Sequence, residues 1–123
     1  MKRDFTYVDD IVEGMVKLMP RIPKGSKKWN ASEPDPATSF APYRIYNIGN
    51  NQPIELLRFI EVLEEKLGKK AIKNLLPMQD GDVRETCADI GDLEKEIGFR
   101  PNTSIEEGIG KFVKWYKEYY HIN

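Results

Sequence analysis

Prolines limit the length of the elements that this chain can form. Five of the eight prolines lie between residues 20 and 42, at Pro20, Pro23, Pro34, Pro36 and Pro42. A proline removes an amide donor and breaks a helix, so no regular element can run through this segment. We therefore expect a flexible loop at about residues 21–42. A loop longer than ~15 residues in a compact domain is usually functional, disordered or an insertion.

The remaining composition describes one soluble globular domain, which we expect to span residues 1–123. The chain is 40% apolar and 32% charged, with 19 basic and 20 acidic residues. Two full domains do not fit this length, but one real core does. The near-neutral charge argues against a nucleic-acid partner. No apolar run reaches the ~20 residues that cross a bilayer, and residues 1–4 lack the apolar stretch of a signal peptide, so we expect no membrane partner and a cytoplasmic location.

Four stretches have the spacing of amphipathic helices. The first follows Asp9 and Asp10, which we expect to be its N-caps, and the second runs from Pro53 to Gly68. The third follows Asp89 as its N-cap and ends at Gly98. The fourth begins at Ser104, which forms a capping box with Glu107. Three short stretches are rich in strand-forming residues: 5–8, 44–49 and 71–76. The alternation predicts an α/β fold, specifically a small α+β-like domain of short strands with about four helices.

Residues able to carry out catalysis are scarce. The one histidine, His121, is the third residue from the end, and the one cysteine, Cys87, has no base beside it in the sequence. We expect His121 to be an inert tail residue and Cys87 a small buried filler. No Cys or His spacing predicts a metal site. Neither GxGxxG nor GxxxxGK[ST] occurs in the sequence, so we predict no catalytic residue, no metal and no bound cofactor in this chain.

Two polar clusters remain as candidate binding residues. Arg3 and Asp4 precede the first predicted strand, and the polar segment 78–84 lies between a predicted strand and a predicted helix. An arginine presents a planar fork that fits phosphate oxygens, and an aspartate can accept two hydrogen bonds from the vicinal diol of a ribose. Taken singly, each cluster also fits a plainer interpretation, a solvated arginine and an ordinary turn.

Together, three motifs resemble a known family. RDFTYVDD at residues 3–10, YNIG at 46–49 and PMQDGDV at 77–83 resemble the C-terminal portion of the nucleotide-sugar epimerases and dehydratases of the extended short-chain dehydrogenase/reductase family, and especially the UDP-glucuronate 4-epimerases. The resemblance implies the substrate-binding part of that fold without its Rossmann domain. In the full-length family, that larger domain carries a glycine-rich NAD loop and a catalytic Tyr-x-x-x-Lys pair, and neither motif occurs here.

The resemblance also implies which residues hold the substrate. Arg3 matches the arginine that contacts the UDP diphosphate, and Asp82 matches the acidic residue that binds the uridine ribose. Gln79 falls where many relatives carry a second phosphate-binding arginine, and Arg84 is a fourth substrate-binding candidate. Asp4, Asp10 and Asn47 also match family signatures, but we expect them to cap helices and close turns.

The resulting expectation is the substrate-binding fragment of a UDP-glucuronate-type epimerase that is not catalytic alone, because a hydride cannot leave a sugar without a nicotinamide to hold it. Its expected partners are a UDP-sugar, bound weakly, and either a Rossmann-domain half or a second copy of the chain. Two alternatives stay open. The chain could be a stand-alone protein-interaction module, since loss of a covering domain exposes apolar surface, or it could be an inactive remnant.

Overall fold

The computed structural model describes residues 1–122 and shows a small domain of four helices and one two-stranded ladder over that range. The elements in chain order are β1 (Lys2–Arg3), α1 (Val8–Leu18), β2 (Ile54–Glu55), α2 (Leu56–Leu67), α3 (Gly91–Ile97) and α4 (Ile105–Tyr120). β1 and β2 pair antiparallel. The predicted fold class, short strands with about four helices, is confirmed.

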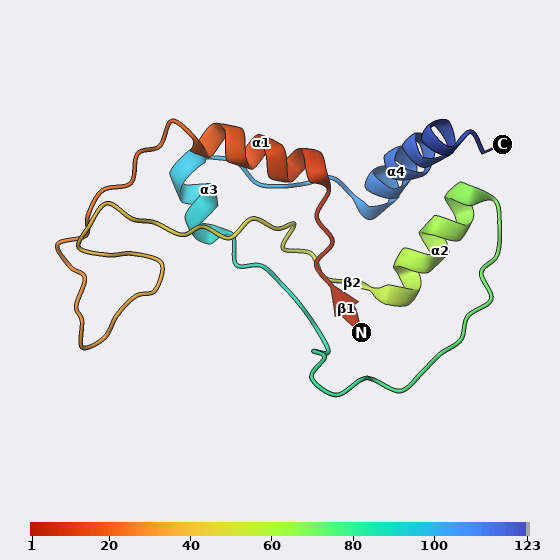
Figure 1. Cartoon of the computed structure of the whole chain (residues 1–123), viewed down its shortest axis with the longest axis horizontal. Coiled ribbons are helices and arrows are strands. Elements are labelled where there is room, and N and C mark those ends of the chain that lie inside the picture. The colour runs from red at the N-terminus through yellow and green to blue at the C-terminus, as the bar shows by residue number, and fades with distance from the viewer. Residues whose placement is uncertain (123) are drawn as a thin grey trace.

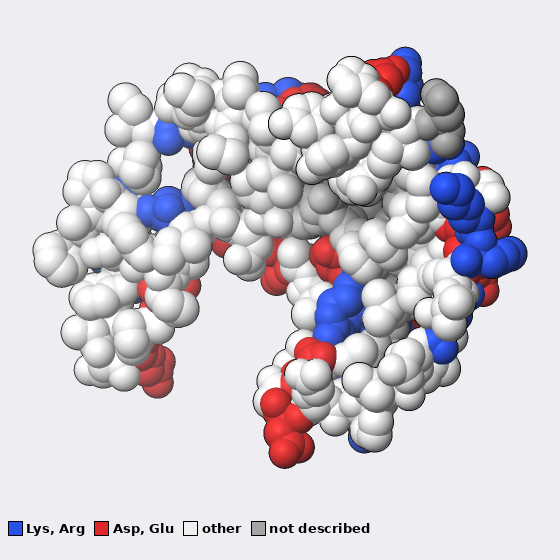
Figure 2. Space-filling view, turned by 45° about the vertical axis from the view of Figure 1, so that its right-hand side comes forward, with Lys and Arg blue, Asp and Glu red and all other residues white. Residues whose placement is uncertain are grey.

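The helices form two separate pairs with the ladder between them. α2 packs beside α4, and α1 packs beside α3 (Figure 1). Long irregular segments join these elements, one between α1 and β2 and the other between α2 and α3. In the space-filling view the two irregular segments form arms on either side of a wide notch (Figure 2). The molecule is therefore open on the face that this view shows.

The main core lies between α2 and α4. Val62, Ile109 and Val113 are buried there, and partly buried apolar side chains surround them: Phe59, Leu63, Leu67 and Ile105. The predicted start of α4 is confirmed, since the Ser104 hydroxyl accepts a hydrogen bond from the Glu107 amide at 3.2 Å. The predicted end of α2 is confirmed too, because Gly68 has the left-handed backbone of a C-cap, with φ of 69°.

Two details of the predicted helices are wrong. α1 begins at Val8 with Tyr7 as its N-cap, so Asp9 and Asp10 lie inside the first turn instead of before it. Asp10 is buried and accepts a hydrogen bond from the Thr103 amide at 3.0 Å, which fastens α1 to the segment before α4. In α3, similarly, the N-cap is Ile90 and not the predicted Asp89, which lies one residue earlier and accepts a hydrogen bond from the Gly91 amide at 3.0 Å.

None of the three predicted strands forms. Residues 5–7 are irregular and Val8 begins α1, residues 71–76 are irregular, and within 44–49 only Arg44 makes an isolated bridge, to Thr38. The real ladder pairs Lys2 with Glu55 and Arg3 with Ile54. A strand exists only where a partner satisfies its hydrogen bonds, and that partner is not encoded in local propensity.

The prediction for Cys87 is also wrong. Its side chain is exposed, and the Sγ atom lies 3.1 Å from Oδ1 of Asn51. The predicted loop over about 21–42 is confirmed as irregular backbone with several turns. It has some internal packing, since the Trp29 and Phe40 rings lie 5.6 Å apart and the Ser26 amide donates to the Ser39 carbonyl at 2.8 Å. Its flexibility stays a prediction.

One carboxylate fastens the segment after α2 to that helix. The Glu64 side chain is only 4% exposed and accepts hydrogen bonds from Lys70, Lys73 and the Ala71 amide, at 2.8, 2.6 and 3.0 Å. The bonds from Lys70 and Lys73, followed by that from Ala71, lower the pKa of Glu64 from 4.5 to about 2. These bonds fix the start of the arm that leads to the polar turn at 79–82.

This arrangement predicts how stability depends on pH. Because the pKa of Glu64 is lower in the folded chain than in the unfolded chain, its contribution is complete above about pH 4.5 and is lost as the pH falls towards 2. Glu64→Gln should lower the free energy of unfolding at pH 7 and flatten its decrease between pH 4.5 and 2, as measured by urea denaturation. Glu65→Gln, at the exposed neighbouring position, is the matched control. If the free energy of unfolding of Glu64→Gln falls as steeply between pH 4.5 and 2 as that of the unaltered chain, the stabilising role of Glu64 is contradicted.

Candidate nucleotide-binding site

The backbone that carries Arg3 is held on both sides. On one side β1 pairs with β2, and the Leu56 amide donates to the Met1 carbonyl at 3.0 Å. On the other side the Lys2 amide donates to the Arg84 carbonyl at 2.9 Å, and the Lys2 carbonyl accepts from the Thr86 amide at 3.3 Å. Because hydrogen bonds hold both edges of this short strand, the position of Arg3 is set by its backbone.

Asp4 joins three segments at this place. Its Oδ2 atom accepts hydrogen bonds from the amides of Asn51 and Ala88, at 3.0 and 2.9 Å, and Oδ1 accepts from Gln52 at 3.3 Å. The Asp4 amide donates to the Thr86 hydroxyl at 3.1 Å. The predicted structural role of Asp4 therefore agrees with its contacts. The same holds for Asn47, whose side-chain Nδ2 atom donates to the Asp89 carbonyl at 3.2 Å.

The close packing around Asp4 explains why the last position of the predicted strand 44–49 is a glycine, Gly49. A Cβ atom on Gly49 would lie 2.4 Å from the Ala88 Cβ and 3.1 Å from Oδ2 of Asp4. Only glycine lets these segments approach so closely. The YNIG motif contains this glycine, but the local sequence does not indicate that Ala88 approaches it.

Removing the Asp4 charge tests this junction. Asp4→Asn keeps the side-chain shape but replaces one accepting oxygen with an NH₂ group that faces backbone donors. We expect the free energy of unfolding to fall by roughly 3 kcal/mol, since hydrogen bonds to a charged group contribute about 1.5–3 kcal/mol each. Asp9→Asn, on the exposed first turn of α1, should change it by less than about 1 kcal/mol. Equal losses in urea denaturation for the two variants would contradict the role of Asp4.

A tight turn presents Asp82. The Asp82 amide donates to the Gln79 carbonyl at 3.2 Å, and Gly81 has a φ of 85°, a conformation that glycine adopts without strain. The Asp82 carboxylate is held in turn, because Oδ1 accepts a hydrogen bond from the Val83 amide at 2.7 Å. The turn therefore fixes both the backbone and one carboxylate oxygen of Asp82.

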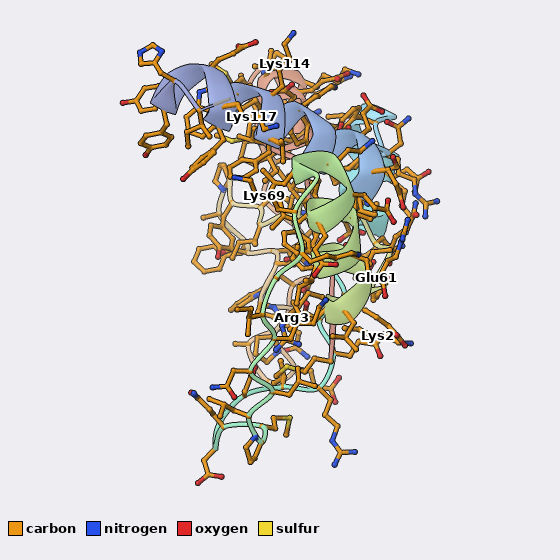
Figure 3. All side chains as sticks on the ribbon, turned by 90° about the vertical axis from the view of Figure 1, so that its right-hand side faces the viewer. Lys2, Arg3, Glu61, Lys69, Lys114 and Lys117 are labelled. Atoms are coloured by element: carbon orange, nitrogen blue, oxygen red, sulfur yellow. The ribbon has the colours of Figure 1, made fainter. Side chains whose placement is uncertain are left out.

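Arg3 and Asp82, which are 79 positions apart in the sequence, meet in the structure. The Arg3 Nη2 atom donates to Oδ1 of Asp82 at 2.7 Å, and Nη1 donates to the Lys2 carbonyl at 2.9 Å. The two side chains are 24% and 39% exposed, so solvent still reaches the pair. Arg3 and Lys2 leave β1 on opposite sides (Figure 3), as alternate residues of a strand must.

The other two predicted site residues lie close in the chain but are not tied to this pair. Gln79 and Arg84 flank the same turn and are exposed. Their backbone carbonyls take part in the contacts above, whereas their side chains make no hydrogen bond or ion pair with residues 1–122. Two of the four predicted site residues are thus in direct contact, and the other two lie along the same segment.

Neither a metal-ligand group nor a membrane-spanning helix is found among the described residues. Within residues 1–122, no group of three histidine, cysteine, aspartate or glutamate side chains is placed to hold a metal ion. None of the described helices has the length and apolar character to cross a bilayer.

Comparison with known proteins points to one family. The chain is 52% identical to Protein CapI of Staphylococcus aureus over 120 residues, which cover 98% of this chain and 36% of that protein. It is 45% identical to a probable UDP-glucuronate 4-epimerase of Rhizobium meliloti over 122 residues, again 98% of this chain and 36% of that protein. No family model matches the chain. The chain spans about a third of the length of these relatives.

Solved structures of UDP-sugar epimerases are also similar to this chain. The UDP-glucuronic acid 4-epimerase from Bacillus cereus, in complex with UDP-glucuronic acid and NAD, matches with a TM-score of 0.69 at 28% identity, covering 95% of this chain and 32% of that one. The UDP-glucose 4-epimerase from Bifidobacterium longum has a TM-score of 0.71 at 20% identity over 98% of this chain and 31% of that one, which supports the fold alone.

The fold is that of the C-terminal part of an extended short-chain dehydrogenase/reductase. Within that class, the chain is similar to about a third of the length of proteins named as UDP-glucuronate 4-epimerases. The resemblance expected from the RDFTYVDD, YNIG and PMQDGDV motifs is confirmed.

Proposed function

We propose that this chain is the UDP-sugar-binding part of a UDP-glucuronate-type 4-epimerase, with Arg3 at the diphosphate and Asp82 at the ribose. The observation that carries the proposal is the contact between these two residues, at 2.7 Å, although they lie 79 positions apart in the chain. Gln79 and Arg84 border the same turn and complete the proposed binding segment. The homologues and the ligand of the Bacillus cereus structure support the choice of substrate.

The geometry suits the two halves of a nucleoside diphosphate. Arg3 has a fixed backbone, and its guanidinium uses Nη1 and Nη2 for the protein contacts without using all five of its donors. Asp82 uses Oδ1 for both of its contacts, and its Oδ2 accepts no hydrogen bond within the described residues. An arginine donor and a carboxylate acceptor therefore stand side by side, as a diphosphate next to a ribose diol requires.

The junction of β2 and α2 does not fit the pyrophosphate of a dinucleotide cofactor. The ladder passes into a helix at one point, where Glu55 of β2 is followed by Leu56 of α2. This junction has no glycine to let a pyrophosphate approach the backbone, and its N-cap is a carboxylate, which repels one. The related structures contain NAD, so we infer that a separate NAD-binding domain supplies the cofactor and the proton-transfer residues of the reaction.

Binding of UDP tests the proposed residues. UDP should shift the NMR amide signals of residues 2–4 and 80–84, with a dissociation constant in the millimolar range because the contacts of a second domain are missing. Arg3→Gln should raise that constant by at least about tenfold, since it removes a charge-assisted bond to the diphosphate. Lys2→Gln, whose side chain leaves β1 on the other side, should change it less than about threefold.

Other outcomes of this titration count against the proposal. Shifts confined to α4 place the nucleotide elsewhere. A loss in Lys2→Gln as large as that in Arg3→Gln shows a general charge effect instead of a contact.

A second function, a protein-interaction module, is favoured by the exposed apolar side chains. On α1, Val8, Val12, Met15 and Val16 are each more than half exposed. On α4, Trp115, Tyr119 and Tyr120 are similarly exposed. The Trp115 and Tyr119 rings stack with centroids 5.4 Å apart, and the Tyr119 and Tyr120 rings meet edge to face at 4.9 Å. Apolar surface of this extent is typical of a docking face. A separate NAD-binding domain as the docking partner unites the two functions.

Assays with and without that domain separate these functions. The chain mixed with NAD and UDP-glucuronate should form no UDP-galacturonate, because a nicotinamide must be held against the sugar to take and return the hydride. Adding the separately expressed NAD-binding domain of a homologue should produce turnover and a faster-sedimenting complex. Turnover by the chain alone contradicts the proposed division of labour. A complex without turnover or UDP binding favours the interaction module.

A further inference from the structure

The charge of Arg3 is already compensated in the structure. Its Nη2 atom lies 2.7 Å from Oδ1 of Asp82, so an anion approaching this guanidinium also meets a carboxylate a few ångströms away. Opposite charges at this separation cancel much of each other's field, and the like charges of the anion and Asp82 repel. A diphosphate on its own is therefore a poor ligand for the Arg3–Asp82 pair.

Asp82 cannot readily turn away to relieve this repulsion. Its Oδ1 atom accepts from both Arg3 and Val83, each at 2.7 Å, and the turn beneath it is closed by the bond from its own amide to Gln79. Movement of the carboxylate breaks two of these bonds at once. The repulsive charge is thus a built part of the site.

A ribose offers what a bare diphosphate lacks. Its vicinal hydroxyls are donors, and Oδ2 of Asp82 is an acceptor that no residue among 1–122 occupies. Hydrogen bonds from a diol to this oxygen offset the repulsion between the carboxylate and the attached diphosphate. A ligand carrying both groups gains from each member of the pair, whereas a ligand with phosphates alone gains from one and is repelled by the other.

We propose that Asp82 is a specificity-determining residue that makes the Arg3 site select a nucleoside diphosphate over inorganic diphosphate. This inference rests on the proposed function, because it assigns the selectivity of the same site. A negative element that penalises the wrong ligand is a general means of obtaining specificity. The proposal also implies that Asp82 weakens the binding of inorganic diphosphate, although that ligand has no ribose for Asp82 to contact.

Titrations with UDP and with inorganic pyrophosphate, both without magnesium and followed by NMR, test the proposal. Asp82→Asn should bind pyrophosphate roughly fivefold more tightly than the unaltered chain, because the repulsion is gone and Arg3 is free. The same variant should bind UDP no more tightly than the unaltered chain, so the preference for UDP should fall at least about fivefold. The gain should shrink at high salt, since the pair is partly exposed.

Two further variants make the result specific. Asp80→Asn removes an equal charge from the same turn, and Asp80 makes no ion pair with Arg3, so the preference for UDP should change little. In the double variant Arg3→Gln with Asp82→Asn, the gain in pyrophosphate binding should disappear. Circular dichroism of each variant confirms that it is folded.

Three results overturn the inference. Pyrophosphate binding by Asp82→Asn that is unchanged, weaker or undetectable shows that Asp82 exerts no penalty. An equal gain in Asp80→Asn shows a net-charge effect, and a gain that survives without Arg3 shows that the anion binds elsewhere. Failure of the proposed function is distinct, because UDP then shifts no signal near Arg3 in the unaltered chain.

Discussion

The candidate site depends on the hydrogen bonds that the Asp4 carboxylate accepts. It accepts backbone hydrogen bonds from the 51–52 and 88 positions, while the Asp4 amide is bonded to Thr86. Backbone donors in irregular segments need acceptors, and one buried or half-buried carboxylate supplies several of them at once. Arg3 is the preceding residue, and the segment 80–84 leads into the same junction. The bonds of Asp4 therefore hold the backbones that carry Arg3 and Asp82 close together.

The local signals of the helices explain why they could be predicted. Ser104 and Gly68 mark helix ends through contacts within a few residues, and both positions hold in the structure. The predicted strands failed for the opposite reason, because they have strand-forming composition but no partner strand. Among the described residues, 44–49 makes only the isolated bridge from Arg44 to Thr38, and 71–76 pairs with no strand. The ladder forms instead at Lys2–Arg3, whose charged side chains give no strand signal.

The site was only partly open to prediction from the sequence. An arginine near the N-terminus and an aspartate in a turn are common, and neither residue alone indicates the other. The family motifs named Arg3 and Asp82 together, but the direct contact between them depends on a junction of long-range backbone hydrogen bonds that local sequence does not encode. Gln79 and Arg84, which belong to the same polar segment 78–84, flank the turn without joining the pair.

The choice of Arg3 over its neighbours argues for selectivity instead of simple attraction. Lys2 is an exposed cation beside the same junction, and its side chain is not paired with a carboxylate within the described residues. A site that needed only to attract phosphate would use such a free charge, because it acts without a competing anion. The fold instead aims Arg3 at Asp82 and fixes both, so the ligand that gains most is one that can satisfy a guanidinium and a carboxylate together.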